Sequence, residues 1–156
     1  MFEVQRGIIR AEKAGVKMFQ NIVTVTALGI CSYVDLRYRK VEKRVAGVYA
    51  AAVFAGRLAE GGAGMTALFT GLVPGILFLF LSFVTRQGIG YGDSILILIL
   101  GASVGIETEL EILLLAVAFS GIWAVVLLFR KRGNVRQEFP FVPFLLAGTV
   151  LEILFV

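Results

Sequence analysis

The chain has 156 residues, of which 58% are apolar, and its formal net charge is +4. Its mean hydropathy is +0.90, while soluble domains have about 45–50% apolar residues, so the composition argues against a soluble fold and for one domain lying mostly in lipid. The single cysteine excludes an internal disulfide bond and a cysteine-based zinc site. The basic residues stand in clusters between apolar runs, which indicates membrane topology and not nucleic-acid binding.

Six apolar segments follow one another and predict an all-α, polytopic membrane protein with about six transmembrane helices. Their approximate ranges are Met18–Val34, Val45–Leu58, Thr66–Val84, Ser94–Ile106, Leu110–Phe129 and Phe141–Val156. The third and fifth are long enough to cross a bilayer alone, whereas the second, fourth and sixth are shorter than the roughly 20 residues that a span needs. Residues 18–156 are therefore expected to form one membrane domain.

Residues 1–17 precede this domain as a basic segment. The positive-inside rule places the basic loops after the first and fifth segments in the cytoplasm, together with the loop before the fourth segment. The acidic loop of Glu107, Glu109 and Glu111 is then expected outside, solvated. On this topology the basic N-terminal segment lies outside, against the rule. Two explanations stay open: an interfacial helix, or a first segment that re-enters without crossing.

Two aspartates stand at the ends of apolar segments on the same predicted side of the membrane. Asp35 directly follows the first segment, and Asp93 follows three alternating glycines, Gly88, Gly90 and Gly92. An acid at the edge of lipid is costly, and it indicates a functional site by default. If Glu107 marks the outer interface, a helix rise of about 1.5 Å per residue places Asp93 below the membrane surface on the inner side. Backbone that is not helical at that depth must be covered by protein or water, so the glycine run is expected to line a water-filled pocket. The alternative is a flexible loop in which Asp93 only caps the next helix.

The rest of the composition favours aspartyl chemistry over other hydrolytic routes. The chain has no histidine, so a serine route lacks its usual base and a metal route has few ligands. We therefore expect neither a metal nor a cofactor. Asp35 lies at the C-terminal end of its predicted helix and Asp93 at the start of its own. This difference in helix-end electrostatics predicts that Asp93 is the general base and Asp35 the general acid. Cys31, one turn before Asp35, is interpreted as a small packing residue.

Three elements of the chain resemble the type IV prepilin peptidases and preflagellin peptidases, which are GxGD-type membrane aspartyl proteases. These elements are Gly90-Tyr91-Gly92-Asp93 before an apolar helix, Asp35 at the start of Asp35-Leu36-Arg37-Tyr38-Arg39-Lys40-Val41, and the later run Pro140-Phe141-Val142-Pro143-Phe144-Leu145-Leu146-Ala147-Gly148. The resemblance extends from about Ile22 to the end. It implies that Asp35 and Asp93 are the catalytic pair and that Gly88, Gly90 and Gly92 belong to the active-site loop.

The resemblance also implies a substrate and a location. The substrate would be a prepilin, pseudopilin or preflagellin-like precursor, whose short basic leader is cut at the cytoplasmic face of the plasma (inner) membrane. The chain departs from the family pattern at two places: Val41-Glu42 stands where Ile-Pro is common, and Ile95 stands where a lysine is common. It lacks the paired Cys-x-x-Cys ligands of the larger bifunctional members, so it resembles a peptidase-only form.

Two alternatives stay open beside the prepilin peptidase. One is another GxGD intramembrane protease with a different substrate. The other is a non-catalytic transporter or proton-relay subunit, which would spread polar groups along the depth of the membrane. The intramembrane acids predicted from sequence gather at the inner end, which favours the protease. Glu152 in the last segment is expected in the bundle interior or near the outer surface, and Arg57 with Glu60 is expected to bound the second segment.

Overall fold

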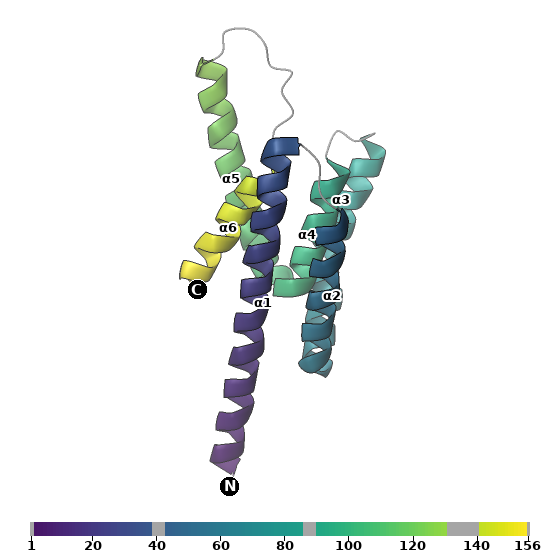
Figure 1. Cartoon of the computed structure of the whole chain (residues 1–156), viewed down its shortest axis with the longest axis vertical. Helices are drawn as coiled ribbons and strands as arrows, with labels where there is room; N and C mark the ends of the chain where they lie inside the picture. The colour runs from purple at the N-terminus through teal and green to yellow at the C-terminus, as the bar shows by residue number, and fades with distance from the viewer. Residues whose placement is uncertain (1, 39–42, 86–89, 131–140, 156) are drawn as a thin grey trace.

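The computed structural model describes residues 2–38, 43–85, 90–130 and 141–155. Over these residues the chain forms six α-helices and no strand, which confirms the all-α prediction (Figure 1). The helices are α1 (Phe2–Tyr38), α2 (Lys43–Ala59), α3 (Gly62–Val84), α4 (Tyr91–Val104), α5 (Ile106–Arg130) and α6 (Val142–Phe155).

Three stretches of helix are long and apolar enough to cross a membrane, namely Gly15–Tyr38, Gly62–Val84 and Ile106–Phe129. The apolar helices α4 and α6 have 14 residues each, about 21 Å of helix, while the hydrocarbon core is roughly 30 Å thick. The predicted lengths of the third to sixth segments are thus confirmed. That α4 and α6 cross the membrane completely stays a prediction.

Two expected boundaries differ from the structure. The basic segment of residues 2–17 is continuous with the first apolar segment, because both belong to the 37-residue helix α1; its interfacial position stays a prediction. The prediction that Glu107, Glu109 and Glu111 lie in a solvated loop is wrong. Only Gly105, with φ of 87°, separates α4 from α5, and all three glutamates lie in the first turns of α5. Acidic residues stabilise that end of a helix through the helix dipole. Glu107 and Glu111 are exposed, but Glu109 is fully buried.

Glycines bring the backbones of α3 and α4 into direct contact. A Cβ atom on Gly71 would overlap the carbonyl oxygen of Gly101, and a Cβ on Gly101 would overlap that of Gly71. One turn further along α3, a Cβ on Gly75 would overlap the backbone of Leu98. Small residues at such a spacing let helices approach closely in lipid, where close packing drives helix association. The glycines therefore set the position of α4 against α3.

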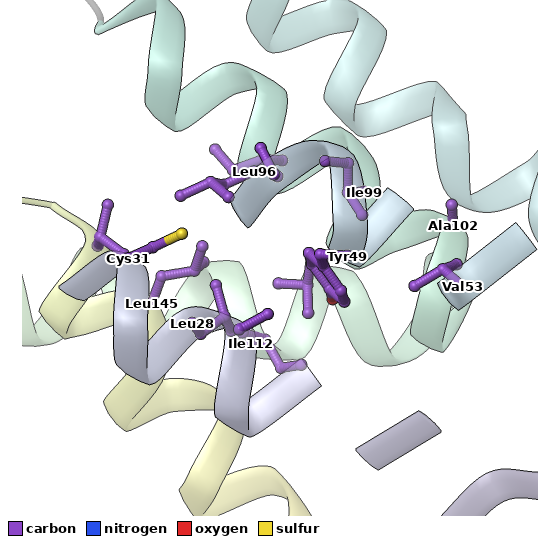
Figure 2. Packing of buried hydrophobic residues seen from close by; sticks show 14 of the residues in the cluster. Leu28, Cys31, Tyr49, Val53, Leu96, Ile99, Ala102, Ile112 and Leu145 are labelled. Atoms are coloured by element: carbon purple, nitrogen blue, oxygen red, sulfur yellow. The ribbon is translucent and has the colours of Figure 1, made fainter. Parts of the chain in front are cut away.

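The core is a cluster of buried side chains to which α1, α2, α4, α5 and α6 all contribute (Figure 2). Leu28, Tyr49, Leu100, Ile112 and Leu145 contribute one fully buried side chain from each of these helices. Cys31 is also fully buried in this cluster, as its interpretation as a packing residue predicts. The packing brings the C-terminal end of α1, the N-terminal end of α4 and the N-terminal end of α6 together at one end of the bundle (Figure 1).

Candidate active site

Asp35 lies in the last turn of α1 and is held by the start of α6. Its side chain is buried, with 8% of the residue exposed. The backbone N–H of Val142, the first residue of α6, donates a hydrogen bond to the Asp35 carboxyl group. The first N–H groups of a helix have no partner inside the helix, so a carboxylate placed there satisfies one of them. The Oδ2 atom of Asp35 is buried and has no hydrogen-bond partner among the described residues.

Asp93 lies in the first turn of α4 and faces the same site. Its carboxyl group is close enough to that of Asp35 for the two charges to interact. The structure therefore brings together the two predicted site residues, although they belong to different helices. Their catalytic role stays a prediction.

The predicted glycine loop is described in part. Gly90 precedes α4, and a Cβ atom there would lie 2.9 Å from Oδ2 of Asp93. Glycine at this position thus leaves room for the carboxylate to lie against the backbone. Gly92 belongs to the first turn of α4 and is half-buried. Gly88 lies outside the described residues.

Ser94 is a site residue that sequence reasoning missed. Its side chain is fully buried, and its Oγ lies 3.3 Å from the carbonyl oxygen of Phe78 in α3 and 3.3 Å from that of Gly90. The hydroxyl can donate its one hydrogen to either carbonyl, and donation to Phe78 ties the first turn of α4 to α3. The sequence signal was available: Ser94 is the one polar residue between Asp93 and the apolar run that follows.

The predicted division of roles between the two aspartates stays a prediction, and the structure adds a contact that it did not consider. It rested on Asp35 lying at the C-terminal end of α1, whereas the start of α6 also meets that carboxyl group. Asp35 therefore meets the C-terminal end of its own helix and the N-terminal end of α6, whereas Asp93 lies in the first turn of α4, so helix-end electrostatics alone does not assign the two roles. The two carboxyl groups interact, and such a pair titrates as a unit.

Other buried polar residues lie at the end of the bundle remote from Asp35. Arg57, in the last turn of α2, pairs at 2.7 Å with Glu60, the residue after the helix, as predicted for the end of this segment. Glu152 of α6 is half-buried and interacts electrostatically with Lys17 of α1. With Glu109 also buried there, acids are not confined to the end of the bundle that carries Asp35, so their distribution no longer favours the protease over the relay. Among the described residues, no group of three or more His, Cys, Asp or Glu side chains is placed to hold a metal ion.

Comparisons with known proteins agree with the resemblance seen in the motifs. The family model described as the type IV leader peptidase family matches residues 22–125, a range that contains Asp35, Gly90 and Asp93 and ends before α6. The chain is 24% identical over 140 residues to the prepilin leader peptidase/N-methyltransferase of Bacillus subtilis (strain 168), an alignment that covers 89% of this chain and 56% of that protein.

Two further relatives carry the same name. The proteins from Burkholderia pseudomallei strains 1026b and K96243 are each 36% identical to this chain over 80 residues, which covers 51% of this chain and 26% of each relative. The chain thus spans about half of the Bacillus relative and about a quarter of the Burkholderia relatives. No solved structure matches the chain significantly.

Proposed function

Since the chain belongs to the type IV leader peptidase family, we propose that it is a membrane-embedded aspartic endopeptidase that removes the short basic leader from prepilin, pseudopilin or preflagellin-like precursors. The observation that carries the proposal is the interacting pair of Asp35 and Asp93, which meet from different helices at one end of the bundle. The names of the relatives support the class of substrate.

The proposed mechanism uses the two carboxyl groups as one acid–base unit. One carboxylate accepts a proton from a water molecule as the water attacks the scissile carbonyl carbon, and the protonated partner donates to the carbonyl oxygen. Collapse of the tetrahedral intermediate then returns a proton to the leaving amine. The Val142 amide holds Asp35, and the start of α4, tied to α3 by Ser94, holds Asp93. Each carboxyl group is thus positioned by a helix end, and such positioning is what proximity catalysis requires.

The proposed location of the reaction is the cytoplasmic face of the plasma (inner) membrane. Arg37, in the last turn of α1, and the basic residues that follow it in the sequence lie two to nine positions after Asp35. A positive-inside bias assigns this end of the bundle to the cytoplasm.

Cysteine labelling tests this orientation. In a Cys31→Ala background, we expect Tyr38→Cys, at the exposed end of α1, to react with a membrane-impermeant thiol reagent only after the cells are opened. Gly62→Cys is exposed at the other end of the bundle, where α3 begins, and is expected to react in intact cells. The native chain is the control, because its only cysteine is buried. Labelling with the opposite sidedness would refute the cytoplasmic placement.

A Gly90→Ala substitution tests the tight packing at Asp93. The added Cβ would lie 2.9 Å from Oδ2 of Asp93, so the carboxylate must move by a few tenths of an ångström or more. Misplacing a catalytic group by about 1 Å can cost on the order of 100-fold, and we expect cleavage of a prepilin substrate to fall by roughly tenfold or more. Gly62→Ala is the matched control, because no atom lies within 4 Å of its Cβ position. Full activity of Gly90→Ala with unchanged thermal stability would contradict the prediction.

The relay alternative remains because Glu109 is buried far from the aspartate pair. It makes a different prediction for the aspartates: their substitution would change proton movement across vesicles and leave precursor cleavage to another protein. Asp35→Asn and Asp93→Asn therefore separate the two functions.

A further inference from the structure

Glu109 is a buried acid that the proposed peptidase mechanism does not use. It lies in the first turn of α5, its residue exposure is 0%, and neither carboxyl oxygen has a hydrogen-bond partner among the described residues. Burying an ionised carboxylate without a donor or a cation costs far more than burying a neutral carboxyl group. The atoms around this side chain therefore decide its protonation state.

The carboxyl group of Glu109 lies where α3 and α4 cross. A Cβ atom on Gly101 of α4 would overlap the carbonyl oxygen of Gly71 in α3, and it would also overlap Oε2 and the carboxyl carbon of Glu109. Two oxygens that overlap the same Cβ position are neighbours, so Oε2 of Glu109 lies beside the Gly71 carbonyl oxygen. Gly71 and Gly101 are both buried, so this contact is closed to solvent.

Two oxygens in such a contact attract each other only when one of them carries a hydrogen. A carbonyl oxygen accepts hydrogen bonds and cannot donate, and an ionised carboxylate also only accepts. A protonated carboxyl group has one O–H, which it can donate to the carbonyl. A backbone carbonyl oxygen has two lone pairs, so it can accept this hydrogen in addition to one from its own helix. The contact with Gly71 thus favours the neutral form of Glu109.

The helices that pack against α5 are α3, α4 and α6, and their described residues offer Glu109 no cation. Helix α3 contains no ionisable side chain, and those of α4 and α6 are Tyr91, Asp93 and Glu152. On α5 itself, the other acids of the first turns are exposed. Nothing in these four helices would stabilise a carboxylate at this position.

Helix α2 carries two further ionisable residues at this end of the bundle. Tyr49 interacts electrostatically with Glu109 but brings no positive charge. Arg57 donates from Nε and Nη2 to the carbonyls at the end of α4, at 2.9 and 2.6 Å, and from Nη1 to Glu60 at 2.7 Å. Its guanidinium group is therefore engaged elsewhere, and no ion pair includes Glu109 among the described contacts.

We propose that Glu109 is protonated in the folded protein and donates a hydrogen bond to the Gly71 carbonyl, which makes a proton-dependent contact between α5 and the crossing of α3 and α4. Ionisation would place a negative charge beside the carbonyl oxygen and weaken the packing of α5. Gly101 follows Asp93 by eight residues, about 12 Å along α4. The contact is therefore separate from the aspartate pair and stands independently of the proposed proteolysis.

The dependence of Tm on pH, measured on the purified protein in detergent, tests this contact. Glutamate in an unfolded chain loses its proton at about pH 4.3. Because the folded protein keeps Glu109 protonated above that pH, raising the pH destabilises the native chain at this residue. Glu109→Gln keeps a donor for the Gly71 carbonyl and has no proton to lose. Its Tm minus that of the native chain should therefore rise by about 2–4 °C or more between about pH 5 and about pH 8.

Glu107→Gln is the matched control, because Glu107 is an exposed acid two residues away on the same helix. The difference between its Tm and that of the native chain should stay nearly constant with pH. For Glu109→Gln, a difference that is constant or that falls as the pH rises would overturn the proposal. Glu109 would then ionise in the folded protein at least as readily as in the unfolded chain.

Glu109→Met tests the hydrogen bond itself, because methionine is of similar size and has no donor. Its Tm should lie about 2–4 °C below that of Glu109→Gln at every pH, and equal values would overturn the bond to Gly71. If neither variant folds, infrared spectroscopy of the native chain with isotope-labelled glutamate decides. The absorption of a protonated glutamate is expected at neutral pH and should persist in Glu152→Gln. Its absence would overturn the proposal.

Discussion

Asp35→Asn and Asp93→Asn are each expected to reduce cleavage of a co-expressed prepilin to background. Asparagine keeps the size of the side chain but cannot exchange a proton, and the remaining carboxyl group cannot act as both acid and base. Loss of one acid–base group typically costs about 10²–10⁴ in rate. The measurement is the gel mobility of the precursor with and without its leader, in membranes that contain equal amounts of each variant.

The control for this experiment is Glu107→Gln, which neutralises an exposed acid at the other end of the bundle. Cleavage by that variant should be unchanged. Appreciable cleavage by either Asp→Asn variant would remove that aspartate from the proposed mechanism. If the precursor is still processed in cells that express either variant, but neither variant moves protons across reconstituted vesicles, the relay function would replace the peptidase.

The largest expected effect on stability comes from Gly71→Val. Its side chain would overlap the Gly101 carbonyl, which is backbone and cannot turn aside, so α3 and α4 must separate. Overpacking usually costs about 1–3 kcal/mol and occasionally more, and a contact with backbone is expected at the upper end of that range. Because α4 carries Asp93, we also expect activity to fall. Thermal unfolding and size-exclusion chromatography of the purified variant provide the measurements.

Gly121→Val is the control for this packing prediction. It introduces the same β-branched residue into a long apolar helix, but no atom lies within 4 Å of the Cβ position of Gly121. Its Tm should remain within about 2 °C of the native value, as expected for a surface change. Equal Tm values for the two variants would show that the contact between Gly71 and Gly101 does not hold the helices together.

Much of the fold follows from the sequence because apolar runs and charges at their ends report directly on membrane helices. The runs before Asp35 and after Asp93 predict the two helix ends that meet in the structure. The prediction of a loop for the glutamates after Gly105 is wrong because acids at the start of a helix and acids in a loop give the same local sequence pattern. Only tertiary packing distinguishes Glu109, which is buried, from Glu107, which is exposed.

The contact between Asp35 and α6 could not be predicted for a related reason. The first N–H groups of a helix attract a carboxylate, but the sequence does not say which of several acids meets which helix. Val142 is separated from Asp35 by 107 positions and lies outside the range matched by the family model. The prediction of separate roles for the two aspartates considered only the helix that carries each aspartate and not this contact, and it stays a prediction.

The contact between Asp35 and Val142 also has a consequence for biosynthesis. A ribosome makes α1 first and α6 last among the described helices, and the two pack directly against each other. Asp35 therefore lacks its Val142 amide throughout the insertion of α2 to α5. Contacts between distant parts of a chain form late, because closing a long loop is entropically costly. The aspartate pair reaches its final arrangement only when α6 docks, so the nascent chain lacks a complete site until that helix has been made.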